Sequence, residues 1–319
     1  MEFVRPRVVV SRCLGFAACR YNAQTVKDDF VAQLAPHVDY VEVCPEEEIG
    51  LGTPREPIRL VRGGDGATTL VQPATDRDLT VLMRDFSHKF LNRSERVDGF
   101  ILKNRSPSCG TAGVKVFAAA AGAPPVGKGP GVFAEAVLER FGHTAIEDEG
   151  RLRNRAIREH FLTRLHALAR LRALADAPSA AALVDFHGRY KYVLMTYTQQ
   201  RLRTLGRIVA GAGRGRASHA VADYRAEFAL ALARPPRPPA HVNTLMHILG
   251  YFSERLSTAE KALFLDVLQE YRTGRTPLSA ALTLLRAWTV RFDVPYLAGQ
   301  AYFEPFPRAL ASLADSGAA

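Results

Sequence analysis

The stretch VVVSRCLG at residues 8–15 places a cysteine just behind a short, fully apolar run. A similar arrangement recurs in YVEVCPE at residues 40–46 and, with a longer connection, in FILKNRSPSCG at residues 100–110. Short apolar runs followed by Gly and Pro are typical of buried parallel strands. Because open α/β sheets collect their ligands at the carboxyl ends of such strands, we expect Cys13, Cys44 and Cys109 to converge on one crevice.

The first half of the chain alternates strand and helix patterns around these motifs. Such alternation predicts an α/β domain with a mainly parallel, Rossmann-like sheet. Two segments rich in Gly and Pro are expected to form surface loops at 50–66 and 122–131. The expected strands are 8–10, 40–43, 69–72, 99–102 and 114–117, and the expected helices are 26–34, 79–91 and 132–141.

The second half shows helical spacing of its apolar residues and no convincing strand. A basic helix is expected at 151–177, and Ser257 followed by Glu260 fits a capping box at the start of a later helix. We therefore predict an α/β domain over residues 1–160 and an all-α domain over residues 161–319. Further helical stretches are expected at 183–209, 219–233, 240–255, 258–272 and 277–291.

Composition and charge narrow the class of protein. The chain has 319 residues, of which 47% are hydrophobic and 23% charged, as in a globular protein. It contains no apolar run long enough to span a bilayer and no cleavable signal pattern, so we expect a cytoplasmic protein whose four cysteines are not disulfides.

The charge is unevenly divided between the two halves. Residues 1–150 hold 18 Lys and Arg against 20 Asp and Glu, whereas residues 151–319 hold 24 against 12. The basic half therefore favours a polyanionic partner, with nucleic acid first. An arginine-rich surface that reflects only genome composition is the alternative.

Three converging thiolates indicate a metal or iron–sulfur centre with one open coordination position. CxxC pairs, as found in zinc fingers and ferredoxins, are absent. Ordinary buried cysteines would give the same pattern. Cys19 adds a further ambiguity, because it could be a fourth ligand, a reactive thiol or a core residue; we favour a position outside the ligand set.

Several motifs together resemble the thiouracil desulfidase (TudS-like) family. They are Ser-x-Cys-Leu-Gly at 11–15, Cys-Arg-Tyr at 19–21, Cys-Pro-Glu at 44–46, Gly-Leu-Gly-Thr-Pro-Arg at 50–55 and Arg-Ser-Pro-Ser-Cys-Gly at 105–110. The resemblance covers about residues 6–160. It implies a 4Fe–4S cluster with three cysteine ligands, here Cys13, Cys44 and Cys109, and one open iron that takes the sulfur of a thiolated base.

The second half resembles a helical module that is often fused to this domain. Its signature here is Phe186-His187-x-Arg189-Tyr190-Lys191-Tyr192, with Leu205-Gly206-Arg207. The combination is similar to bacterial desulfidases that convert 4-thiouridine in transfer RNA to uridine, which agrees with the charge argument. Free thiouracil or thio-UMP as substrate remains the first alternative, and a non-enzymatic iron–sulfur sensor that binds nucleic acid the second.

The reaction that this resemblance implies is hydrolytic and needs a base and contacts to the substrate. Glu46 is the leading general base because it lies two residues from a ligand cysteine, although Glu47 and Glu48 compete with it. A solvated acidic helix start would also explain these carboxylates. Ser106 and Ser108 are candidates for holding water or substrate, or they cap the local backbone. The candidate substrate contacts are Arg20, Tyr21, Arg55, Lys103 and Arg105.

In the basic half, cations that could neutralise RNA phosphates lie close together in the sequence: Arg189, Lys191, Arg203 and Arg207. Aromatic residues lie between them, among them Phe186, Tyr190 and Tyr192, and could stack on bases. We expect these rings to be helix-packing core instead, and His187, His241 and His247 to be structural.

Overall fold

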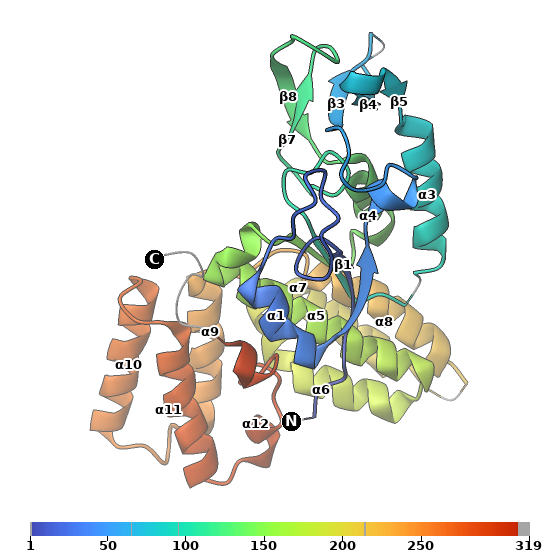
Figure 1. Ribbon diagram of the computed structural model, residues 1–319. Helices are drawn as coiled ribbons and strands as arrows, with labels where there is room; N and C mark the ends of the chain where they lie inside the picture. The colour runs from blue at the N-terminus through green and yellow to red at the C-terminus, as the bar shows by residue number, and fades with distance from the viewer. Residues whose placement is uncertain (1, 65, 95, 214, 312–319) are drawn as a thin grey trace. The chain divides into compact units, whose positions relative to one another are not determined.

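The computed structural model describes residues 2–311, apart from residues 65, 95 and 214. Among the described residues, the chain divides into two compact units, Val4–Ala169 with residues 310–311, and Arg170–Ala309 with residues 2–3. The first is the α/β unit and the second is helical, so the predicted fold class is confirmed (Figure 1). Helix α5 (Arg155–Asp176) contributes residues to both units.

A four-stranded, all-parallel sheet forms the centre of the α/β unit, in the order β2-β1-β6-β9. Its first strand is buried throughout residues 8–10, as expected for a sheet covered on both faces. Its strands are β1 (Arg7–Ser11), β2 (Asp39–Val43), β6 (Gly99–Leu102) and β9 (Ala145–Asp148).

A second sheet of five strands follows the order β5-β4-β3-β7-β8, and only β3 and β7 pair in parallel. The prediction that residues 50–66 and 122–131 form surface loops is therefore partly wrong, because these segments contain β3 and β8. The strands are β3 (Arg59–Arg62), β4 (Thr68–Gln72), β5 (Arg77–Asp78), β7 (Val114–Phe117) and β8 (Pro125–Gly129).

One hydrophobic core joins the two sheets of this unit. Phe100 of the parallel sheet, Leu60 and Val116 of the mixed sheet and Phe133 of α4 belong to the same buried cluster. Helices α3 and α4 pack against each other beside it (Figure 1). The helices of the α/β unit are α1 (Asp29–Leu34), α2 (Pro45–Glu48), α3 (Thr80–Asn92) and α4 (Val132–Phe141).

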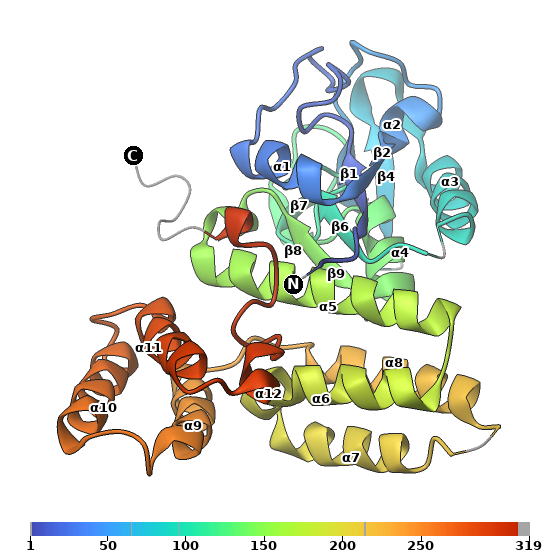
Figure 2. The same cartoon turned by 90° about the horizontal axis from the view of Figure 1, so that it is seen from below.

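In the helical unit, α6, α7 and α8 lie side by side, and α9, α10 and α11 form a neighbouring group (Figure 2). The predicted helical stretch 183–209 is two helices, because Thr198 is extended and caps the second one. The helices are α6 (Ala180–Tyr197), α7 (Gln199–Ala210), α8 (Ala217–Ala231), α9 (Pro238–Leu249), α10 (Thr258–Arg272), α11 (Leu278–Arg291) and α12 (Pro295–Ala298).

Aromatic residues build the core of the helical unit. Phe186 stacks on Tyr190 at 4.5 Å between ring centroids, and both are almost completely buried. The only tryptophan, Trp288, packs on Phe264 at 5.4 Å. The expectation that the aromatic rings of 186–192 are core is therefore confirmed, and so is the capping box of Ser257 with Glu260.

Candidate active site

Parallel pairing brings the three predicted ligand cysteines to one edge of the first sheet. Cys13 lies two residues beyond β1 and Cys44 directly beyond β2, where it is the N-cap of α2. Cys109 follows β6, the other neighbour of β1, by a short loop. All four cysteines are free and buried, with exposed fractions from 2% at Cys19 to 9% at Cys13. The edge therefore carries a buried group of thiols.

Cys19 lies within this group. The Cys44 Sγ donates to the Cys19 carbonyl oxygen at 3.7 Å. Ligand atoms of Cys19, Cys44 and Glu47 all lie within 4.8 Å of one another, which is close enough to hold a single metal ion. This set differs from the predicted one of Cys13, Cys44 and Cys109, although it shares Cys44.

Burial and mutual hydrogen bonds raise the pKa values of three of these thiols. A hydrogen bond with Cys13 raises the pKa of the Cys19 thiol to about 11. A hydrogen bond with Cys19, together with burial, raises the pKa of Cys44, and burial with the Glu46 charge raises the pKa of Cys109. Thiolates are thus unfavourable here without a compensating cation. A group that supplies positive charge to soft thiolates fits this donor set.

Glu46 lies at the centre of a hydrogen-bonded network beside the thiols. Its Oε2 accepts from the Arg55 Nε at 3.0 Å, and the Arg55 Nη2 contacts the same oxygen. Its Oε1 accepts from the Ser108 hydroxyl at 2.9 Å and from the Ser106 hydroxyl at 3.3 Å. Three of the predicted catalytic residues and one predicted substrate contact are therefore in direct contact.

The two serines have different local roles. The Ser106 Oγ accepts from the backbone N–H groups of Ser108 and Cys109, at 3.2 and 3.0 Å, so it shapes the turn that carries the cysteine. Ser108 is fully buried, and its hydroxyl donates to Glu46.

The other glutamates of α2 face a different partner. The Arg12 Nη1 lies 3.1 Å from Glu47 Oε2, and Arg12 Nη2 lies 3.3 Å from Glu48 Oε1. The side-chain exposure rises from 15% at Glu46 to 28% at Glu47 and 45% at Glu48. Only Glu46 of the three is bonded to the serines around Cys109, among the contacts of the described residues.

The remaining predicted substrate contacts differ in how exposed they are and in whether they already have a partner inside the protein. Tyr21 is 45% exposed, and the Arg20 guanidinium lies 5.7 Å from its ring centroid. Arg105 is exposed and has a left-handed backbone, with φ of 56°. In contrast, the Lys103 ammonium contacts the buried Glu149 carboxylate. Lys103 therefore already has an internal anion, whereas Arg105 and Tyr21 are accessible.

Sequence reasoning missed two residues that support this network. Ser11 is buried, accepts from the Lys103 N–H at 2.9 Å and hydrogen-bonds the Cys109 thiol. Glu149 accepts from the Asn104 N–H at 2.7 Å in addition to its pair with Lys103. Ser11 stands in the Ser-x-Cys motif, so its position two residues before Cys13 is the signal that could have found it.

The four predicted RNA contacts lie on α6 and α7. Arg189 pairs with Asp185 at 2.7 Å, and the Lys191 ammonium lies 5.5 Å from the Tyr192 ring centroid. Arg203 and Arg207 are exposed, and Arg207 donates to the Thr204 hydroxyl. His187 and His241 each form a hydrogen bond with a tyrosine hydroxyl, as expected for structural histidines.

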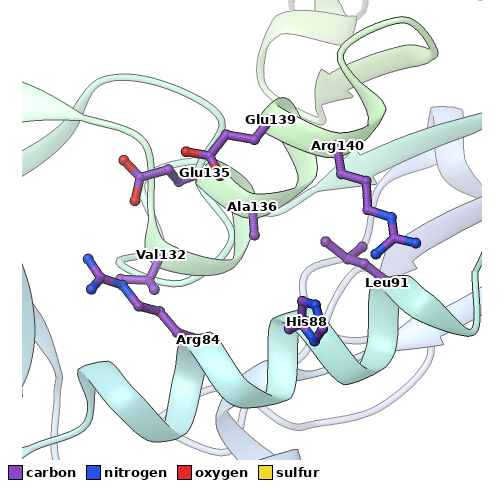
Figure 3. Close-up of a pocket in the computed structure, with 8 residues that line it drawn as sticks. All are labelled: Arg84, His88, Leu91, Val132, Glu135, Ala136, Glu139 and Arg140. Atoms are coloured by element: carbon purple, nitrogen blue, oxygen red, sulfur yellow. The ribbon is translucent and has the colours of Figure 1, made fainter.

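A surface pocket lies elsewhere in the α/β unit, between α3 and α4 (Figure 3). It contains none of the predicted site residues. Its lining combines two arginines, a histidine and two glutamates with small apolar side chains: Arg84, His88, Leu91, Val132, Glu135, Ala136, Glu139 and Arg140.

Comparisons with known proteins divide the chain into two family regions. Through residues 8–149 the chain belongs to the family described as 2-thiouracil desulfurase. Residues 191–307 match a second family, a protein of unknown function designated DUF1722. The predicted family resemblance of the α/β region is thereby confirmed.

Three individual proteins are similar to parts of this chain. YbgA of Escherichia coli (strain K12), an uncharacterized protein, is 33% identical over 158 residues, which are 49% of this chain and 93% of YbgA. The uncharacterized YbbK of Bacillus subtilis (strain 168) is 34% identical over 111 residues, 33% of this chain and 73% of YbbK. The solved [4Fe-4S]-dependent thiouracil desulfidase TudS is 25% identical and covers 46% of this chain and 93% of its own, with a TM-score of 0.37.

Proposed function

We propose that this protein removes sulfur from a thiolated uracil by an iron–sulfur-dependent, hydrolytic reaction, and that its preferred substrate is 4-thiouridine in transfer RNA. The observation that carries the proposal is the network that joins Glu46 to Ser108 next to a group of buried thiols, in a chain of the 2-thiouracil desulfurase family. Such a substrate would place the protein in the cytoplasm.

In this proposal, Cys13, Cys44 and Cys109 hold a 4Fe–4S cluster. They follow three adjacent strands of the parallel sheet, whereas Cys19 lies within the loop after Cys13. When bound, the cluster supplies an iron without a protein ligand, which suits the soft sulfur of a thiocarbonyl. The cluster also supplies the positive charge that the buried thiolates need.

The residues around the cysteines then do the acid–base work. Arg55 holds the Glu46 Oε2, so Oε1 would take up the proton from water, which would replace one of the two serine hydroxyls that now donate to it. The Ser108 hydroxyl, bonded to that oxygen, orients the water toward the carbon that bears the sulfur. Hydrolysis replaces the C=S bond with C=O and releases sulfide, so no electrons are exchanged.

The helical unit is proposed to bind the RNA. It carries most of the net positive charge of the chain, since residues 170–309 hold 19 Lys and Arg against 10 Asp and Glu, and Arg203 and Arg207 are exposed on α7. A thiolated base inside folded RNA must be turned out to reach an iron atom, and contacts to the phosphates would hold the RNA during that step. Arg189 and Lys191 on α6 are the further proposed contacts.

The experiment compares three substrates on anaerobically reconstituted protein: transfer RNA that contains 4-thiouridine, 4-thio-UMP and 2-thiouracil. Sulfide release and loss of the thiouridine absorbance are followed together, with Cys109→Ala as the cluster-free control. We expect the highest kcat/KM with transfer RNA. Turnover of the small substrates alone would refute the RNA proposal, and no turnover of any substrate by cluster-loaded protein would point to a sensor.

A further inference from the structure

The outer face of the mixed sheet in the α/β unit carries a concentration of positive charge that the proposed chemistry does not use. Leu60 and Val116 point into the core, so their neighbours in sequence, Arg59, Lys115 and Phe117, lie on the opposite face. Lys128 of β8 pairs with Lys115 of β7. We call Arg59, Lys115, Phe117 and Lys128 the basic sheet face.

The lysine pair is unfavourable for folding. Residues directly opposite in antiparallel strands place their side chains on the same face within a few ångströms, and like charges in such positions are destabilising. Strands β3, β4, β7 and β8 contain no Asp or Glu. Across the residues that the structure describes, neither lysine forms an ion pair with a carboxylate. The charges on this face are therefore not neutralised from within.

The face also offers a planar surface. The Arg59 guanidinium lies over the Phe117 ring, 4.8 Å from its centroid, and Phe117 is half-buried. Cations interleaved with an accessible ring are suited to a phosphate backbone with unpaired bases.

The connections of the chain relate this face to the thiols. Strand β3 begins four residues after Arg55, which holds Glu46, and β7 begins five residues after Cys109. Because β3 and β7 are parallel, both strands start near the candidate active site and run outward from it. The lysine pair lies on the second residue of β7, close to this starting edge.

We infer that the basic sheet face binds the phosphate backbone of the RNA next to the base that enters the active site. The inference rests on the proposed function, because it assigns a second contact surface for the same substrate. Charge complementarity selects this partner: three cations with an aromatic ring on strands without carboxylates match a polyanion. The α/β unit would then hold the strand at the site itself, separately from the basic helices.

The test compares two double variants of the full-length, cluster-loaded protein. Lys115→Gln with Lys128→Gln removes the paired charges, and Lys89→Gln with Arg93→Gln removes two exposed charges of the same unit, in the last turn and at the C-cap of α3. Affinity for 4-thiouridine transfer RNA is measured at several salt concentrations. Two lost phosphate contacts should reduce the slope of log K against log salt by about 2 and weaken low-salt binding on the order of tenfold.

A single variant separates this effect from misfolding. Lys128→Glu creates an opposite-charge pair with Lys115, so its Tm should equal or exceed that of the parent protein while RNA affinity falls. Turnover of 2-thiouracil should stay unchanged in all variants.

Each other outcome overturns the inference. An unchanged salt slope with normal RNA turnover shows that this face does not touch RNA. An equal loss in the α3 control shows only a general charge effect. Loss of binding to vesicles of anionic lipid, with RNA affinity intact, would assign the face to a membrane. If the parent protein desulfurates 2-thiouracil but does not bind transfer RNA, the proposed substrate itself is wrong.

Discussion

Changing Glu46 to glutamine tests the proposed proton acceptor with the least change in shape. The amide oxygen can still accept from the Arg55 guanidinium, and the amide NH2 can donate to the Ser108 hydroxyl instead of accepting from it, but the amide cannot take up a proton. Arg55 also keeps its bond to the Gly52 carbonyl oxygen at 2.8 Å. The site should therefore stay assembled and lose its base.

The expected size of the effect follows from that role. A positioned general base contributes about 10²- to 10⁴-fold in rate, which corresponds to about 3–5 kcal/mol in the activation free energy. Because Glu46 is not a proposed ligand, iron and sulfide per chain should stay at the parent value. The loss should appear in kcat with KM nearly unchanged, since the group acts in the chemical step.

Helix α2 supplies the matched control. Glu48→Gln makes the same chemical change two residues away, at a side chain that is 45% exposed and pairs with Arg12. Its effect on kcat should be small, because exposed pairs contribute about 0–1 kcal/mol. The assay is anaerobic sulfide release with 2-thiouracil and with thiolated transfer RNA. If Glu46→Gln kept kcat within about threefold of the parent value while holding its cluster, the assignment of Glu46 would be refuted.

Three further results are expected. Cys109→Ala should lose its iron and visible absorbance because it removes a proposed ligand, whereas Cys19→Ala should keep both. Loss of iron from the Cys19→Ala variant as well would make Cys19 a ligand. Lys103→Met should lower the free energy of unfolding by about 3–5 kcal/mol, because it leaves the Glu149 carboxylate buried without its cation, and a similar Tm would contradict this structural role. Burial lowers the pKa of His241 from 6.5 to about 4. Between pH 6.5 and about 4, His241 therefore binds a proton in the unfolded chain but not in the folded one, so the free energy of unfolding falls as the pH drops through this range. His241→Gln should remove up to about 1.4 kcal/mol per pH unit from this slope, read by tryptophan fluorescence of the helical unit; an unchanged slope would refute it.

The sequence is sufficient to predict three strands of the parallel sheet with their cysteines, but not β9, and of the second sheet it predicts only β4 and β7. Fully apolar runs such as residues 8–10 are recognisable because both sides of that strand are buried. Strands β3 and β8 lie in segments rich in Gly and Pro, and β8 is exposed along much of its length. Their pairing with distant strands, rather than their own composition, makes them strands.

The residues of the candidate site were likewise only partly predictable from the sequence. Motif spacing places Cys13, Cys44 and Cys109 at the carboxyl ends of strands, and it selects Glu46 for its position two residues after Cys44. The contacts that distinguish Glu46 from Glu47 and Glu48 come from a loop about 60 residues away, which no local pattern reports. The place of Cys19 among the other thiols likewise depends on how the loop after β1 folds back.

The strand order determines when, during synthesis of the chain, the proposed ligand cysteines first come together. Strand β1 is made first, yet one of its two partners, β6, is synthesised only after α3. A chain still emerging from the ribosome, with β1 and β2 complete, presents two of the proposed ligands and lacks Cys109. With the proposed ligand set, iron–sulfur delivery would have to act on a sheet that has already received β6, so the cofactor would be loaded only after residue 109 has joined the fold.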